Sequence, residues 1–213
     1  MQNFPEASHL LGLSTVFVLL FVTLGPIKVV GPFMQLTRDT DEATMKSIAL
    51  RAFVLGVIAV VVGGLVGQVL VENWRISVTA LTLAGGIIFF LVGLSLVLEP
   101  YQPAHATPAP LPTAPMAAAL RVTFPTVVTP YGIAAVLALL VNSPSVARTV
   151  AIFAILLAVM ALNLLAMLYA RRMMGGVTVL ALQILGAVLG VLQVAVAVQM
   201  ILRGLLGLGV LRV

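Results

Sequence analysis

The stretch GPIKVVGP, residues 25–32, places a lysine between two Gly-Pro pairs, near the end of an apolar run that starts at about Leu10. A proline inside a helix removes one backbone hydrogen bond and clashes with the carbonyl of the preceding turn. We therefore expect Pro26 and Pro32 to interrupt the first long helix. Lys28 lies within this interruption, so the same stretch also predicts a charge where backbone polar groups are exposed.

The composition is that of a membrane protein. Of the 213 residues, 62% are hydrophobic and 8% are charged, and the mean hydropathy is +1.24. Soluble domains carry about 25% charged residues. We therefore predict an all-α integral membrane protein, with residues 1–213 forming a single membrane domain.

Six apolar segments are long enough to cross a bilayer, which takes about 20 residues in a helix. They cover roughly residues 10–34, 47–70, 77–98, 117–141, 147–170 and 178–202.

A proline-rich linker, residues 99–116, divides these segments into two halves of three, residues 1–98 and 117–213. Pro125 and Pro130 interrupt the leading segment of the second half, as Pro26 and Pro32 interrupt that of the first. Because each half has an odd number of spans, the second half enters the membrane from the opposite side. The expected fold is six transmembrane helices arranged as two inverted three-helix repeats, with broken helices 1 and 4.

The two interruptions are the candidate substrate site. Broken helices leave N–H and C=O groups that lipid cannot satisfy, and such groups can bind the carboxylate and ammonium of a small zwitterion. The alternative is that the prolines produce structural kinks only. The candidate residues are Gly25, Pro26, Lys28, Gly31, Pro125, Thr126, Thr129 and Pro130.

Lys28 allows two interpretations. Along a continuous helix it would lie about 27 Å beyond Leu10, near the far interface, and its ammonium would reach the headgroups. If the helix breaks at Gly25-Pro26, the chain can instead turn inward and bring Lys28 to a central cavity.

Several classes of function find no support in the sequence. Cysteine is absent, which removes thiolate metal sites and dithiol redox chemistry, and His9 and His105 have no metal-binding partners nearby. All six acidic residues lie at or outside the predicted helix ends, and no hydrolase, metalloprotease or phosphate-loop motif is present. We expect no enzyme activity, no catalytic residue, no metal and no cofactor.

The basic residues predict topology and not nucleic-acid binding, because they are scattered around the apolar segments. The connections after the first, third and fifth spans contain Arg38, Lys46, Arg121, Arg171 and Arg172. The N-terminus, the two other connections and the C-terminus contain Arg75, Arg148, Arg203 and Arg212. This small excess favours periplasmic termini in a bacterial inner membrane. The expected partners are the lipid bilayer and a small-molecule substrate, and a homo-oligomer is possible.

Three stretches together resemble the MarC family, also called the small neutral amino acid transporter family, which is related to the LysE exporters. They are GQVLVENWRIS at residues 67–77, LAGGI at residues 83–87 and AVQMILRGL at residues 197–205. Six spans with the longest linker in the middle also fit this family. The resemblance implies export of small neutral amino acids or related metabolites.

The chain departs from the family pattern at both interruptions. Where the family has Asn-Pro-x-Gly, this chain has Gly25-Pro26-Ile27-Lys28, and where it has Gly-Pro-Gly, this chain has Thr129-Pro130-Tyr131. We therefore expect a secondary transporter or exporter of a divergent subfamily, whose substrate can differ from that of its relatives. The alternative is a non-transporting scaffold or lipid-binding helix bundle.

Overall fold

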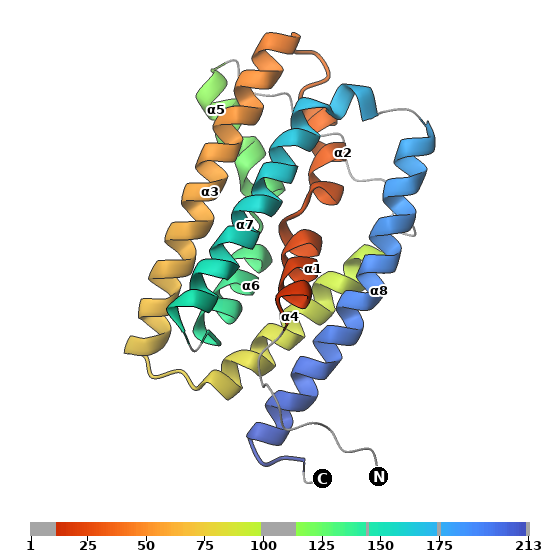
Figure 1. Cartoon of the computed structure of the whole chain (residues 1–213). Coiled ribbons are helices and arrows are strands. Elements are labelled where there is room, and N and C mark those ends of the chain that lie inside the picture. Colours follow the sequence, from red (N-terminus) through yellow and green to blue (C-terminus); the bar gives the residue numbers. More distant parts are fainter. Residues whose placement is uncertain (1–11, 99–113, 144, 174–175, 212–213) are drawn as a thin grey trace.

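A computed structural model describes residues 12–98, 114–143, 145–173 and 176–211 as an all-helical bundle (Figure 1). The predicted linker therefore lies outside the described residues, apart from residues 114–116, which lead into a helix. In chain order the elements are α1 (Leu13–Leu24), α2 (Pro26–Leu36), α3 (Glu42–Asn73), α4 (Val78–Leu98), α5 (Pro115–Arg121), the π-helix η2 (Val122–Val127), α6 (Pro130–Val141), α7 (Val146–Leu168), the 3₁₀-helix η3 (Ala170–Met173) and α8 (Gly176–Gly207).

Five segments of the described chain are long and apolar enough to cross a membrane. They correspond to the first, second, third, fifth and sixth apolar segments of the sequence, with α1 and α2 together forming the first. The fourth segment, 117–141, is divided among α5, η2 and α6, and α6 alone is too short to span. The chain is thus a multi-pass helical membrane protein.

The path of the chain alternates between two ends of the bundle. In Figure 1, α1 and α2 run upward, α3 downward and α4 obliquely upward, whereas α5 and α6 run downward, α7 upward and α8 downward. The connections near Arg38 and Arg171 therefore lie at the upper end, and those near Arg75 and Arg148 lie at the lower end.

The first helix breaks at a single point. Gly25 is extended (φ −85°, ψ 176°) between α1 and α2, and Pro26 is the first residue of α2. The prediction that Pro32 also interrupts this helix is wrong, because α2 continues through Pro32 to Leu36. A proline can be accommodated within a helix that bends or adjusts locally.

The second break covers more residues. Phe124, directly before Pro125, has non-helical angles (φ −123°, ψ 126°), as expected for a residue that precedes proline. The chain is helical again up to Val127, is extended at Val128 and Thr129, and begins α6 at Pro130. Pro26 and Pro130 therefore occupy equivalent places, each as the first residue of a half-helix.

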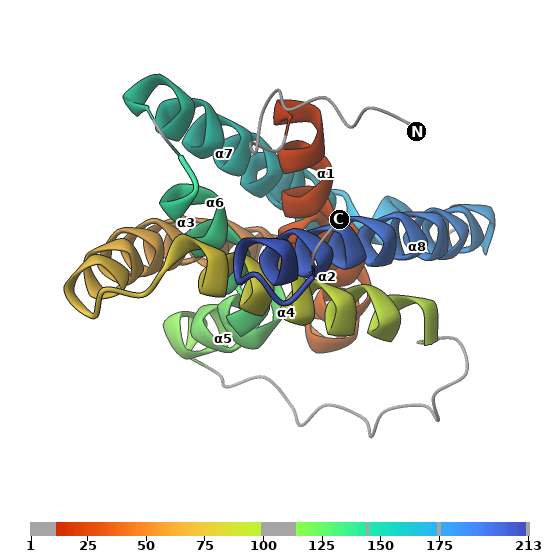
Figure 2. The ribbon, with the colours of Figure 1, turned by 90° about the horizontal axis from the view of Figure 1, so that it is seen from below.

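Each half of the chain packs its broken helix against a long helix of the other half. The broken helix of the first half, α1 with α2, packs against α7, and the broken helix of the second half, α5 with η2 and α6, packs against α3. Similarly, α4 contacts α6 and α1 contacts α8. The most extensive contact joins α4 to α8, which lie side by side when the bundle is viewed from below (Figure 2).

Small residues bring α4 and α8 close together. A Cβ added at Gly86 would lie 3.1 Å from the carbonyl oxygen of Ala197, and one at Gly93 would lie 3.1 Å from that of Gly190. Such backbone proximity is typical of small-residue helix interfaces in membranes. Gln193, which is buried, adds a hydrogen bond of 3.1 Å from Nε2 to the carbonyl of Phe89.

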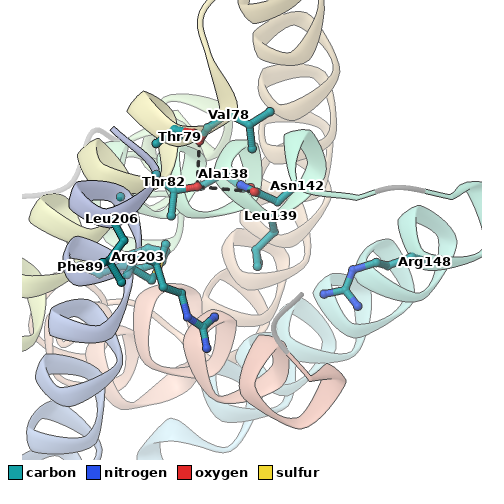
Figure 3. A pocket seen from close by; sticks show the side chains of 13 residues that line it. Val78, Thr79, Thr82, Phe89, Ala138, Leu139, Asn142, Arg148, Arg203 and Leu206 are labelled. Carbon is teal, nitrogen blue, oxygen red and sulfur yellow. Dashed lines mark hydrogen bonds between the residues drawn. The ribbon is translucent and has the colours of Figure 1, made fainter. Parts of the chain in front are cut away.

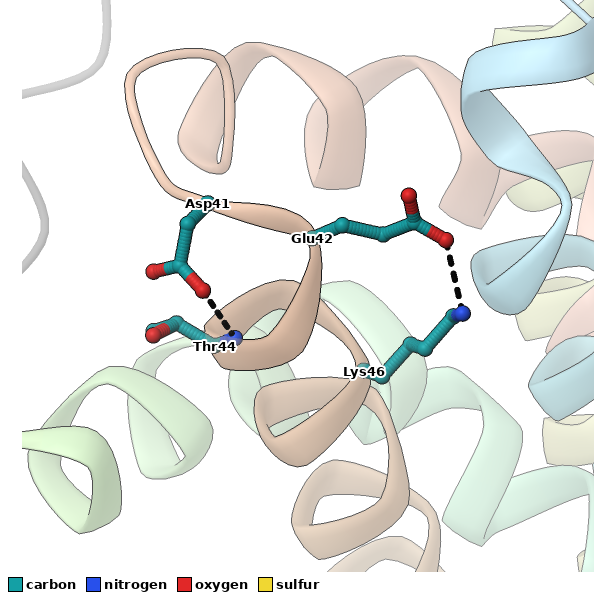
Figure 4. Close-up of polar contacts among 4 residues, drawn as sticks. All are labelled: Asp41, Glu42, Thr44 and Lys46. Carbon is teal, nitrogen blue, oxygen red and sulfur yellow. Dashed lines mark hydrogen bonds and ion pairs between the residues drawn. The ribbon is translucent and has the colours of Figure 1, made fainter.

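Polar contacts fix the connection between α2 and α3 at the upper end. Asp41 caps α3 by accepting a 3.0 Å hydrogen bond from the Thr44 amide, and Lys46 pairs with Glu42 at 2.6 Å (Figure 4). Hydrogen bonding from Thr44 lowers the pKa of the Asp41 carboxyl from its ordinary value of 3.8. Arg171 donates to the carbonyl of Thr40 and ties the end of α7 to this connection.

Candidate functional site

The two helix breaks face each other in the bundle. α1 packs against α6, and α2 packs against η2, so the extended residues of one broken helix lie beside those of the other. One close contact involves Leu24, the last residue of α1, and Gly132 in the first turn of α6. A Cβ on Gly132 would lie 2.2 Å from Leu24 Cδ2, so only glycine leaves room for this contact.

Lys28 and Tyr131 bridge the two breaks. The Lys28 ammonium donates a 3.1 Å hydrogen bond to the Tyr131 hydroxyl and lies 4.5 Å from the centroid of its ring. The second distance is within the range of a cation–π interaction. Both side chains are half-buried. Lys28 thus contacts the second break and is not fully solvated.

The charge of Lys28 lies at the positive end of a helix dipole. It is the third residue of α2, where a cation is disfavoured by about 0.3–1 kcal/mol. Gly25 provides no side-chain cap, so it leaves the first amides of α2 available to an anion. At the start of α6, by contrast, the Thr129 hydroxyl accepts a 3.1 Å hydrogen bond from the Gly132 amide.

Acidic side chains do not balance this charge within the described residues. Asp39, Asp41, Glu42 and Glu72 are all exposed and lie at helix ends. The formal charge at the breaks is therefore positive and comes from Lys28, because α1 and η2 end where α2 and α6 begin and place negative helix ends beside the positive ones. No group of acidic or histidine side chains able to hold a metal ion occurs in the part of the chain that the structure describes.

Asn163 of α7 satisfies a carbonyl that the first break exposes. Its Nδ2 donates to the carbonyl oxygen of Leu24, and its side chain is fully buried. Its Oδ1 is also buried and has no hydrogen-bond partner among the described residues. Asn163 therefore stabilises the break and brings an unused acceptor to its edge.

The structure brings together some of the predicted site residues. Gly25 and Thr129 are buried beside the contact of the two breaks, and Pro26 and Lys28 follow Gly25 directly. Thr126 is half-buried in η2, which also contains Pro125, and Pro130 begins α6 with an exposed side chain. Gly31 is exposed and has open space around it, away from the contact between Leu24 and Gly132.

Three further residues belong to this region that the sequence did not single out as site residues. Tyr131 pairs with Lys28, Gly132 gives space to Leu24, and Asn163 binds the freed carbonyl. Tyr131 has one sequence signal, because it directly follows the proline of the second break. Asn163 has none, because a single polar residue in a transmembrane helix more often only ties helices together.

A separate cavity of about 550 Å³ lies near the lower end of the bundle, between α4, α6 and α8. Figure 3 shows Arg203 of α8 and Arg148 of α7 extending toward the same space from opposite sides. From the sequence, both arginines were expected to determine topology alone.

The fold defines a multi-pass integral membrane protein with polar groups between two broken helices. The profile of the MarC family integral membrane proteins matches residues 11–208, nearly the whole chain. The protein belongs to the MarC family. Searches of curated proteins and of solved structures give no match.

Proposed function

We propose that this protein is a secondary transporter or exporter of a small solute, with its substrate site where the two broken helices meet. The observation that carries the proposal is the bridge between Lys28 and Tyr131 across the two breaks. A charged residue inside a membrane bundle is costly and commonly marks a substrate or ion pathway.

The positive charge at the breaks suits an anionic group of the substrate. A carboxylate at the start of α2 would interact with the uncapped amides and with the Lys28 ammonium, which can exchange its contact with Tyr131 for a stronger charge-assisted hydrogen bond. The Thr129 hydroxyl and the Asn163 Oδ1 are nearby groups that can bind the rest of the solute. Small neutral amino acids, which the family resemblance implies, are the first candidates.

We further infer that the bundle comprises two inverted three-helix repeats that cross the membrane six times. The packing of each broken helix against the long middle helix of the other half, α7 or α3, supports this arrangement. The opposite directions of corresponding helices in Figure 1 support it as well. Rocking of one repeat against the other would then expose the site alternately to the two sides.

The same proposal assigns the protein to a bacterial inner membrane with periplasmic termini. The upper end, which carries Arg38, Lys46, Arg121, Arg171 and Arg172, would face the cytoplasm. The excess of basic residues at this end over the other supports the orientation.

Counterflow in proteoliposomes tests the transport function. Labelled alanine, glycine, serine and threonine would be offered to vesicles preloaded with the same unlabelled amino acid. Saturable exchange is expected for at least one of them, with a strong loss in Lys28→Ala and Thr129→Val. Gln199→Ala, which changes an exposed residue of α8, is the matched control and should exchange at the rate of the natural protein.

The competing explanation is a scaffold or lipid-binding bundle in which the breaks are kinks only. It predicts no saturable exchange with any solute in protein that is folded and inserted. Exchange that is equal in the natural protein and in both variants would show transport through another site.

A further inference from the structure

The cavity at the lower end of the bundle has a charged wall and an apolar wall. Arg203 lies one turn before the end of α8, and Arg148 lies in the first turn of α7. Both side chains line the cavity, and Figure 3 shows their guanidinium groups directed toward the same space. Two arginines from different helices thus converge on one volume of about 550 Å³.

The guanidinium of Arg203 is available to a ligand. Arginine remains charged at any physiological pH and presents a planar set of donors that matches a carboxylate or a phosphate. Within the described ranges, no carboxylate lies at salt-bridge distance from Arg203. An anion in the cavity would therefore meet a charge that the described residues do not neutralise.

Two other polar side chains of the cavity use donors for hydrogen bonds within their own helices. The Thr82 hydroxyl donates a 2.8 Å hydrogen bond to the carbonyl of Val78, and Asn142 Nδ2 donates one of 2.7 Å to that of Ala138. Thr82 therefore has no donor left, whereas Asn142 keeps one N–H and Thr79 has a hydroxyl, both neutral. The two arginines are the charged groups among the described lining residues, so they would bind a negative group most strongly.

The remaining wall favours an apolar body on the ligand. The buried Phe89, Leu139 and Met200 line the cavity, and Val78 and Leu206 line it with exposed side chains. A fully polar anion would leave Val78 and Leu206 facing water, whereas an amphipathic one would cover them.

We propose that this cavity binds an amphipathic organic anion, with a carboxylate or phosphate head held by Arg203 and Arg148 and an apolar body against Phe89, Leu139 and Met200. The head can belong to a soluble organic acid or to an anionic lipid. The site is separate from the helix breaks, so it does not depend on the proposed transport function.

The test measures binding of labelled 4-phenylbutyrate to the full chain in phosphatidylcholine nanodiscs. Saturable binding is expected, and 4-phenylbutyramide, which lacks the charge, should not compete. Loss of a charge-assisted contact should weaken binding about tenfold or more in Arg203→Gln and in Arg148→Gln. Arg203→Lys, which keeps the charge without the planar donor set, should give an intermediate affinity.

Two variants serve as controls. Arg172→Gln removes an exposed arginine beyond the end of α7, at the opposite end of the bundle, and should bind normally. Thr82→Val removes a hydroxyl from the cavity without removing an available donor and should change the affinity by less than about threefold. Thermal unfolding of each variant would show that it is folded.

A second arm tests the lipid source of the anion. Native mass spectrometry would compare retained lipids after release from nanodiscs that contain phosphatidylglycerol and phosphatidylcholine. Preferential retention of phosphatidylglycerol that Arg203→Gln abolishes would support the proposal with a lipid head in the cavity. The absence of both soluble-anion binding and selective lipid retention would overturn the proposal. Binding that Arg203→Gln leaves unchanged would overturn it as well.

Discussion

Leu24 and Gly132 are in contact where the two broken helices meet, and a Cβ on Gly132 would lie 2.2 Å from Leu24 Cδ2 and 2.8 Å from its Cγ. Leu24 is only 2% exposed, so its side chain has little space to move away. The last residue of one half-helix therefore limits the size of the side chain at the start of the other.

Gly132→Ala should destabilise the protein through this contact. Overpacking of a buried contact costs about 1–3 kcal/mol. Thermal unfolding in detergent should show a lower midpoint, and the double variant Leu24→Ala/Gly132→Ala should lose less stability than the sum of the two single changes. Strict additivity would mean that the two residues do not limit each other.

Gly25→Ala should be more damaging still, because its Cβ would lie 1.9 Å from the carbonyl oxygen of Phe21. That atom belongs to the backbone, so α1 itself would have to shift. We expect poor insertion or a large loss of thermal stability. Gly31→Ala is the matched control on the same broken helix: nothing lies within 4 Å of its Cβ, and alanine is favoured over glycine in a helix by about 0.5–1 kcal/mol. Equal effects of the two changes would contradict the account of the first break.

Asn163→Ala should leave the carbonyl of Leu24 without its partner. A buried polar group without its partner costs about 1–3 kcal/mol, and the lost side-chain volume adds to this. The expected result is a lower unfolding midpoint than that of Gln199→Ala, an exposed change on α8. Similar midpoints for the two variants would indicate that the carbonyl finds another partner.

The cap at Asp41 gives a dependence on pH. Its pKa is lowered in the folded protein by hydrogen bonding from Thr44, so the stabilisation is present above the ordinary value of 3.8 and is lost as the pH falls through the folded pKa. Asn is also a good N-cap residue but does not titrate. Unfolding midpoints measured from pH 6 down to pH 3 should fall less for Asp41→Asn than for the natural protein; parallel curves would contradict this role.

The fold was largely predictable because its signals are local. Apolar length predicted the five spans that the described chain contains, and Pro26 and Pro130 were correctly expected to interrupt the two helices. The predicted interruption at Pro32 was wrong because a proline can break one helix and be accommodated in another. Which of the two occurs depends on the surrounding packing. Helix ends were less accurate: α8 continues to Gly207, beyond the predicted 202, since its last residues pack on Leu83 and Thr79 of α4.

The candidate site was predictable only where its residues adjoin the prolines. The pairing of Lys28 with Tyr131 joins residues that are 103 positions apart, and that of Asn163 with Leu24 joins residues 139 apart. No spacing rule connects such positions in one sequence. Likewise, Arg148 and Arg203 look like ordinary residues at helix ends until the bundle places both beside one cavity.

The most direct test of the central claim is the accessibility of position 28, because the chain is naturally free of cysteine. Lys28→Cys would be labelled in oriented membranes with a membrane-impermeant thiol reagent, with and without a solute that exchanges in the counterflow assay. We predict labelling through a water-filled path, and protection by that solute at concentrations high enough to offset the affinity lost with the Lys28 ammonium. Rapid labelling from one side that no solute slows would place residue 28 at the interface and contradict a substrate site at the helix breaks.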